Sequence, residues 1–264
     1  MLKTRLWTAA IALPVLLAAI LFGSDSFFRL FIAVLGCFAL YEIAAMTWAA
    51  SPGRIALAIA ILLAVGAVPL FALLYCGDAG WLLPTLVILM MLALMIVVAR
   101  RGADAGPKGL ALTAIGAAYA GVLFPYFALL RNSPRGIELL VLMLALVIAS
   151  DTGAYFVGRG IGKTKLMPLV SPNKTVEGAI GGLVSSIIAG LMLRPMLAPD
   201  WSIAGAAIFS AAIAVLAQLG DLAGSALKRS AGVKDSGWLF PGHGGLIDRT
   251  CSLVLAAVFT YYYS

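Results

Sequence analysis

Carboxylate, hydroxyl and cationic side chains recur at helical spacing in the segment 218–229. Residues three and four apart share one face of an α-helix. Steps of that size connect five polar residues here, namely Gln218, Asp221, Ser225, Lys228 and Arg229. Carboxylate and hydroxyl oxygens suit Mg²⁺, and Lys and Arg bind phosphate oxygens. The row therefore predicts a site for a metal-bound polyphosphate, with a solvated helix end and a routine ion pair as the alternative.

A glycine-rich turn precedes the last apolar segment. It reads Phe-Pro-Gly-His-Gly-Gly over residues 240–245, and Asp248 and Arg249 follow at the expected start of a helix. Glycines allow a close backbone approach to a ligand, and the N–H groups of a helix N-terminus favour an anion. We expect this segment to contribute to the same site through Lys234, His243, Gly244, Gly245, Asp248 and Arg249.

A third polar segment, Ser-Pro-Asn-Lys-Thr-Val-Glu-Gly over residues 171–178, leads into another apolar run. Thr175 can cap a helix there, and Lys174 stands beside the helix N-terminus as a candidate phosphate ligand. The alternative is an ordinary loop with a capped helix. Asp151, which we place at the end of the preceding helix on the same side, could add a carboxylate or a hydrogen bond.

Acidic residues in or beside spanning helices need a partner, a water-filled cavity or a metal, because a buried charge is costly there. Five residues qualify, namely Glu42, Asp151, Glu177, Asp221 and Asp248. All but Glu42 lie near the polar segments described above, and this clustering favours a site. For Glu42 we expect a satisfied buried carboxylate paired with Lys or Arg.

The elements that position these residues are apolar helices. Of the 264 residues, 63% are hydrophobic and 11% are charged, which excludes a soluble globule. Runs of about twenty apolar residues are typical of membrane-spanning helices. The sequence predicts an all-α polytopic membrane protein of about nine such helices, at 6–22, 27–47, 55–74, 81–99, 110–130, 139–157, 176–193, 203–219 and 246–262. It predicts a single transmembrane domain, 1–264, with N-terminal helices in 1–135 and a motif-bearing catalytic part in 139–264.

The distribution of Lys and Arg predicts the orientation, since cytoplasmic loops are enriched in both. The net charge of +7 therefore needs no nucleic acid partner to explain it. With a cytoplasmic N-terminus, the cytoplasmic side receives fourteen cations: Lys3, Arg5, Arg54, Arg100, Arg101, Lys108, Arg159, Lys163, Lys165, Lys174, Lys228, Arg229, Lys234 and Arg249. The other side receives four: Arg29, Arg131, Arg135 and Arg194. Nine helices then place the C-terminus outside, and both long polar loops in the cytoplasm.

The motifs together closely resemble those of the phosphatidate cytidylyltransferase family. The resemblance rests on Ser-Ala-Leu-Lys-Arg at 225–229, the segment Lys-Asp-Ser-Gly-Trp-Leu-Phe-Pro-Gly-His-Gly-Gly-Leu-Ile-Asp-Arg at 234–249, and the segments 151–155 and 171–178. It implies transfer of CMP from CTP to phosphatidate, giving CDP-diacylglycerol and pyrophosphate. It also implies Mg²⁺, with a second cation as a further option, and a homodimer in membrane lipid, here the bacterial inner membrane. One departure is Cys251, where the family usually has a second aspartate.

The residues fit that chemistry, because a lipid phosphate can attack the α-phosphorus of CTP without a protein nucleophile. We assign Asp221 and Asp248 to the metal, Lys174, Lys228 and Arg229 to phosphates, and His243 to the leaving pyrophosphate. Two alternatives stay open. A related CTP-dependent lipid kinase would use similar groups, and a membrane transporter would explain intramembrane acids, although transporters place them near the middle of the bilayer.

Overall fold

The computed structural model describes residues 2–48, 115–116, 118–237, 239 and 244–264, and of residues 2–9, 47–48 and 120 the backbone only. These residues form two compact units. Unit 1 lies within Met1–Leu129 and Ala231–Asp248, and unit 2 comprises Leu130–Ser230 and Arg249–Ser264. The polar segments of the sequence are therefore divided between two structural bodies.

Unit 1 is built on two long helices, α1 (Leu2–Phe22) and α2 (Asp25–Trp48). Gly23 and Ser24 separate them, and the hydroxyl of Ser24 accepts a hydrogen bond from the amide of Phe27 (3.2 Å), which is a typical helix cap. A short π-helix, η3 (Tyr119–Leu123), and helix α6 (Pro125–Arg131) follow in the chain. The largest buried side chains of this unit are apolar: Ile20, Phe28, Leu40, Ile43 and Phe124.

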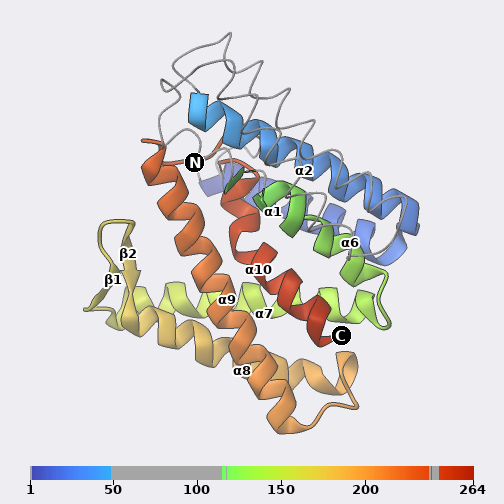
Figure 1. Ribbon diagram of the computed structural model, residues 1–264. Helices are drawn as coiled ribbons and strands as arrows, with labels where there is room; N and C mark the ends of the chain where they lie inside the picture. The colour runs from blue at the N-terminus through green and yellow to red at the C-terminus, as the bar shows by residue number, and fades with distance from the viewer. Residues whose placement is uncertain (1, 49–114, 117, 238, 240–243) are drawn as a thin grey trace. The chain divides into compact units, whose positions relative to one another are not determined.

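Unit 2 contains the long helices α7 (Gly136–Ile161), α8 (Val176–Leu197) and α9 (Ile203–Ser230), and most of α10 (Ile247–Tyr263). An antiparallel hairpin of β1 (Lys165–Met167) and β2 (Ser171–Thr175) joins α7 to α8, with Lys165 opposite Thr175. Figure 1 shows this hairpin at one end of α7 and α8. The sequence predicted a loop there, because Pro172 and Asn173 do not favour strands.

Small residues allow α8 to pack closely against its neighbours. The buried positions of α8 recur every fourth residue, at Gly178, Gly182, Ser186 and Gly190. A side chain added at Gly182 would collide with the carbonyl of Ser150 on α7 (2.8 Å). The hydroxyl of Ser186 donates to the carbonyl of Ser210 on α9 (3.0 Å). Such rows are common where helices pack in membranes, since they bring backbones together.

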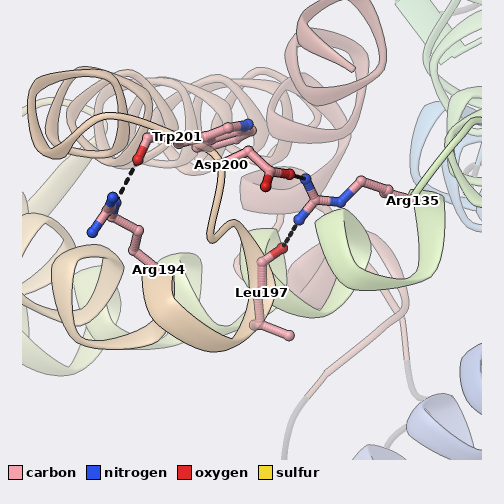
Figure 2. Close-up of polar contacts among 5 residues, drawn as sticks. All are labelled: Arg135, Arg194, Leu197, Asp200 and Trp201. Carbon is pink, nitrogen blue, oxygen red and sulfur yellow. Dashed lines mark hydrogen bonds and ion pairs between the residues drawn. The ribbon is translucent and has the colours of Figure 1, made fainter.

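Arginines hold together the opposite end of α7 and α8. Arg135, in the left-handed region (φ 59°), donates to the carboxylate of Asp200 (2.6 Å) and to the carbonyl of Leu197 at the end of α8 (2.8 Å). Arg194 donates to the carbonyl of Trp201 (2.5 Å), as Figure 2 shows. Cations at a helix C-terminus satisfy its last carbonyls and interact favourably with its dipole. The turn from α8 to α9 is thereby fixed.

The chain is a polytopic membrane protein and mostly helical, as predicted. Among the described residues, four helices are long and apolar enough to cross a membrane: Asp25–Met46, Gly136–Ile161, Val176–Leu197 and Ile203–Ser230. The predicted spans 55–74 and 81–99 lie outside the described residues, as does the start of 110–130. Two predicted helices ended too early, because α7 continues to Ile161 and α9 to Ser230. Asp151 consequently lies within its helix rather than at its end.

Candidate functional site

An ion pair between Lys174 and Asp221 connects the polar segment 171–178 with the row on α9. The Lys174 Nζ lies 2.6 Å from the Asp221 Oδ2. Lys174 is on β2, immediately before α8, and Asp221 is two thirds of the way along α9. Their side chains are 28% and 41% exposed, so a ligand can reach both. Two residues that lie 47 positions apart in the sequence thus share one location.

Asp151 and Arg249 extend this pair to a cluster of four charged residues from four elements. Asp151, on the exposed face of α7, interacts electrostatically with Asp221, Lys174 and Arg249. We call these four residues the unit 2 cluster. The cluster combines two carboxylates with two cations, and such a set can bind a metal ion together with phosphate groups. The sequence had given Asp151 only an undecided role.

The hairpin is anchored so that Lys174 is presented beside α9. Thr175 caps α8, as predicted, because its hydroxyl accepts from the amide of Gly178 (3.1 Å). The carboxylate of Glu177 accepts from the amides of Lys163 (3.1 Å) and Thr164 (3.1 Å). The amide of Val176 donates to the carbonyl of Thr164 (2.9 Å). The Glu177 carboxylate is therefore hydrogen-bonded to backbone amides just before the hairpin. This explains how one of the five acidic residues is satisfied.

The polar row on α9 is helical throughout, because α9 continues to Ser230. At its start, the side chain of Gln218 donates to the carbonyl of Ala179 on α8 (3.0 Å). Ser225 and Lys228 are half-buried, and Arg229 is exposed. A neighbouring face packs on α10: a side chain at Gly220 would meet the backbone of Cys251, and one at Gly224 would meet its thiol. Cys251 is itself buried, at 5% exposure, between positions that flank Asp221.

In unit 1, Asp248 organises the turn that precedes α10. Its Oδ2 accepts from the amide of Ser236 (2.8 Å), the hydroxyl of Ser236 (3.0 Å) and the amide of Gly245 (2.9 Å). Gly244 has a positive φ (+82°), and a side chain there would collide with the Asp248 carboxylate. The turn thus needs glycine at 244 for its conformation and for space. Asp248 and Arg249 begin α10, as the sequence predicted.

The hydrogen-bond partners of Glu42 differ from those expected. The sequence suggested a pair with Lys or Arg, but the partners are the hydroxyl of Ser236 (2.8 Å) and the amides of Leu246 (2.7 Å) and Ile247 (3.0 Å). The carboxylate is buried, with the residue 4% exposed, and satisfied by these donors. Nothing local could have predicted this, because the partners lie 194 to 205 positions away.

The predicted residues are thus distributed over both units. Lys174, Asp221, Ser225, Lys228, Arg229 and Arg249 belong to unit 2, whereas Lys234, Gly244, Gly245 and Asp248 belong to unit 1. Lys234 is exposed in the turn after α9. His243 lies outside the described residues. The predicted metal pair, Asp221 and Asp248, therefore has one member in each unit.

The donors of the unit 2 cluster fit a magnesium ion. Among the residues that the structure describes, no group of three or more His, Cys, Asp and Glu is arranged as a metal cage. Mg²⁺ usually has no such cage, because it binds one or two carboxylates and completes its shell with water and substrate phosphates. Asp151 and Asp221 supply that kind of donor set. Zinc sites typically include His or Cys ligands, whereas the described donors of this cluster are carboxylates.

Comparison with known proteins gives a consistent relationship. Residues 3–264 match the sequence model of the cytidylyltransferase family. A phosphatidate cytidylyltransferase of Brucella suis is 42% identical over 151 residues, which cover 56% of this chain and 55% of that protein. Those of Bacillus subtilis (39% over 149 residues, 56% and 55%) and Haemophilus influenzae (46% over 134 residues, 49% and 46%) are similar.

In these alignments the chain spans about half the length of the curated relatives it matches. The family match, by contrast, extends over nearly every residue of the chain. It includes the unit 2 cluster and the turn before α10, and it confirms the resemblance drawn from the motifs. The chain belongs to the cytidylyltransferase family.

Proposed function

We propose that this protein transfers CMP from CTP to phosphatidate and so makes CDP-diacylglycerol for phospholipid synthesis. The unit 2 cluster carries the proposal, because it places two carboxylates and two cations together in a chain of this family. Relatives named phosphatidate cytidylyltransferase support the choice of substrates. An anionic nucleotide and an anionic lipid both need cations that bind phosphate oxygens.

The reaction needs positioning and charge neutralisation rather than a protein nucleophile. An oxygen of the phosphatidate phosphate attacks the α-phosphorus of CTP, and the bond from that phosphorus to the bridging oxygen of the β-phosphate breaks. Pyrophosphate leaves with the electron pair, and the lipid keeps CMP. Holding the reacting groups in line supplies much of the rate enhancement in such transfers.

Each charged residue has a role in this scheme. Lys174, Lys228 and Arg229 bind phosphate oxygens of CTP and of the lipid, and Arg249 and Lys234 add positive charge. Ser225, Gly244 and Gly245 contribute a hydroxyl and close backbone approach to the nucleotide. His243 assists the leaving pyrophosphate. These assignments are supported by the Lys174–Asp221 contact and by the position of Arg249 beside Asp151.

Asp221 would hold Mg²⁺, and Asp151 and Asp248 are the other carboxylates proposed to serve it. A magnesium ion held there would supply charge neutralisation and polarisation of the phosphates, a task that a second cation could share. Lys174 pairs with Asp221 (2.6 Å), so its ammonium group lies where a phosphate bound to the metal would be. On binding, Lys174 turns from the carboxylate to a phosphate.

We further propose nine membrane spans in one domain, 1–264, with a cytoplasmic N-terminus and an external C-terminus. Within unit 2, the hairpin with its lysines lies at the opposite end of α7 and α8 from Arg135 and Arg194 (Figures 1 and 2). This supports placing the hairpin between α7 and α8 on one side of the bacterial inner membrane, and the turn between α8 and α9 on the other side. A homodimer follows from the family resemblance. An active C-terminal alkaline phosphatase fusion is expected, and an inactive one would refute this topology.

Labelled CTP separates this activity from its closest alternative. Purified protein is incubated with phosphatidate, Mg²⁺ and CTP labelled at either the α- or the γ-phosphorus. CMP transfer puts the α label into lipid and the γ label into pyrophosphate. A CTP-dependent lipid kinase would put the γ label into lipid instead, and a transporter would label no lipid at all.

A further inference from the structure

Glu42 is a buried acid in the N-terminal half that contacts the C-terminal motif. It lies on α2, and its residue is 4% exposed. Its Oε1 accepts from the amide of Leu246 (2.7 Å), and its Oε2 accepts from the amide of Ile247 (3.0 Å). These amides stand at the start of α10, where the helix dipole and N–H groups that make no hydrogen bond within the helix favour an anion. All of these residues belong to unit 1.

Two glycines of the motif give the carboxylate its space. A side chain at Gly245 would collide with both Glu42 carboxylate oxygens, and one at Gly237 would approach Oε1 to 2.7 Å. Gly245 also donates its amide to Asp248 (2.9 Å), so its backbone lies between the two acids. The shape of the turn and the position of Glu42 are therefore matched to each other.

Ser236 links Glu42 directly to Asp248. Its hydroxyl lies 2.8 Å from the Glu42 Oε2 and 3.0 Å from the Asp248 Oδ2. A hydroxyl has one proton, so it donates to one carboxylate at a time, while the amide of Ser236 stays bonded to Asp248 (2.8 Å). A chain of polar contacts thus runs from α2 through Ser236 to the first turn of α10.

We propose that Glu42 is a positioning residue for the reaction, acting through Ser236 and the amides of Leu246 and Ile247 to hold Asp248 in place. This inference rests on the proposed function, because it gives Asp248 a role in turnover. The neutral amide introduced by Glu42→Gln would keep one carbonyl acceptor and present an N–H₂ group to a backbone N–H, which leaves that donor unpaired. Groups that orient a metal ligand typically change activity by about 10- to 100-fold when they are replaced.

The test compares Glu42→Gln, Glu42→Asp and Ser236→Ala with the wild type in detergent. Ser186→Ala is the matched control, because it removes another buried hydrogen bond, between α8 and α9. Hydrogen exchange of peptides covering 244–250 is measured without substrate, and kcat is measured per folded protein. We expect faster exchange at 244–250 and about a 10- to 100-fold lower kcat in Glu42→Gln. Glu42→Asp should show exchange and kcat values between those of Glu42→Gln and the wild type. Ser186→Ala should match the wild type in exchange and in kcat.

Two results would overturn the inference. Unchanged exchange in Glu42→Gln would show that the carboxylate does not hold the turn. Faster exchange with wild-type kcat would show that it holds the turn without serving turnover. If Glu42→Gln does not fold, Glu42→Asp and Ser236→Ala decide between these results. A wild type that transfers no CMP contradicts the proposed function instead, and the exchange measurement still reports on the contact itself.

Discussion

The carboxylates of unit 1 and those of unit 2 are satisfied in different ways. Glu42 and Asp248 receive hydrogen bonds from backbone amides and from one serine hydroxyl, and they shape a turn. Asp151 and Asp221 instead interact with charged side chains, those of Lys174 and Arg249. Backbone donors cannot leave without unfolding the turn, whereas a lysine side chain can rotate away. The comparison indicates that unit 1 supplies fixed geometry and unit 2 supplies exchangeable charge.

The exposure of the Lys174 and Asp221 side chains explains why the charges of unit 2 are exchangeable. The Lys174 and Asp221 side chains are 28% and 41% exposed, and ion pairs of this kind typically contribute at most about 1 kcal/mol. Little free energy is therefore lost when a metal ion or a phosphate replaces one partner. Glu42, at 4% exposure, would leave a buried charge without donors if its contacts opened.

The largest effect is expected from Asp221→Asn, which removes the carboxylate that pairs with Lys174 in the unit 2 cluster. Turnover should fall by more than about 100-fold, since changing an outer-shell partner of a metal ligand alone costs about 10- to 100-fold. Initial rates over a range of Mg²⁺ concentrations measure it. Asp200→Asn is the matched control, because Asp200 pairs with Arg135 at the other end of the unit. Near-normal turnover in Asp221→Asn at saturating Mg²⁺ would refute the metal role.

Asp248→Asn should also abolish most turnover, but with a structural signature that Asp221→Asn lacks. An amide nitrogen at Oδ2 would face the amides of Ser236 and Gly245, which are donors as well. We expect faster hydrogen exchange at 244–250 in Asp248→Asn and wild-type exchange there in Asp221→Asn. Equal exchange in the two variants would remove the distinction between a fixed and an exchangeable acid.

Lys174→Ala should lower kcat/KM for CTP by about 10- to 100-fold, from about 1.5–3 kcal/mol for a hydrogen bond to a charged group. Lys174→Arg keeps the charge and should retain more activity. The control is Lys165→Ala, on the neighbouring strand of the hairpin and exposed. If Lys174→Ala and Lys165→Ala behave alike, Lys174 serves only as a partner for Asp221 and does not bind phosphate.

The smallest effect concerns Cys251, where the family usually has an aspartate. The buried Cys251 packs on α9, with its thiol against Gly224 and its backbone against Gly220, and these two glycines flank Asp221. A thiol is a poor ligand for Mg²⁺, which prefers oxygen. We expect retained activity with weaker metal binding, so Cys251→Asp should lower the Mg²⁺ concentration for half-maximal rate several-fold. Cys251→Ser should change little. An aspartate variant that needs as much Mg²⁺ as its parent would place position 251 outside the site.

Local patterns were enough to predict much of this molecule. Apolar runs gave the helices, the hydroxyl of Thr175 gave a cap, and steps of three and four gave the row on α9. These features depend on residues within one or two turns of each other. The start of α10 near Asp248 and Arg249 could also be predicted locally, since an apolar run follows the glycines directly.

Two of the missed features, the partners of Glu42 and the neighbours of Asp151, depend on contacts between distant segments. The partners of Glu42 lie about two hundred positions away, so only packing brings them together. The predicted membrane span ended at Leu219, whereas α9 continues to Ser230. Hydropathy set that boundary, and the polar residues after Leu219 have the hydropathy of a loop. Asp151 received no firm role, since its neighbours come from β2, α9 and α10.

The most direct test of the account is the fate of the α-phosphorus of CTP in the presence of purified protein, phosphatidate and Mg²⁺. The account predicts that the α label enters lipid with one pyrophosphate released per lipid labelled, that chelation of Mg²⁺ stops it, and that Asp221→Asn nearly abolishes it. Label that stays in the nucleotide, or lipid labelled only from the γ-phosphorus, would contradict the account.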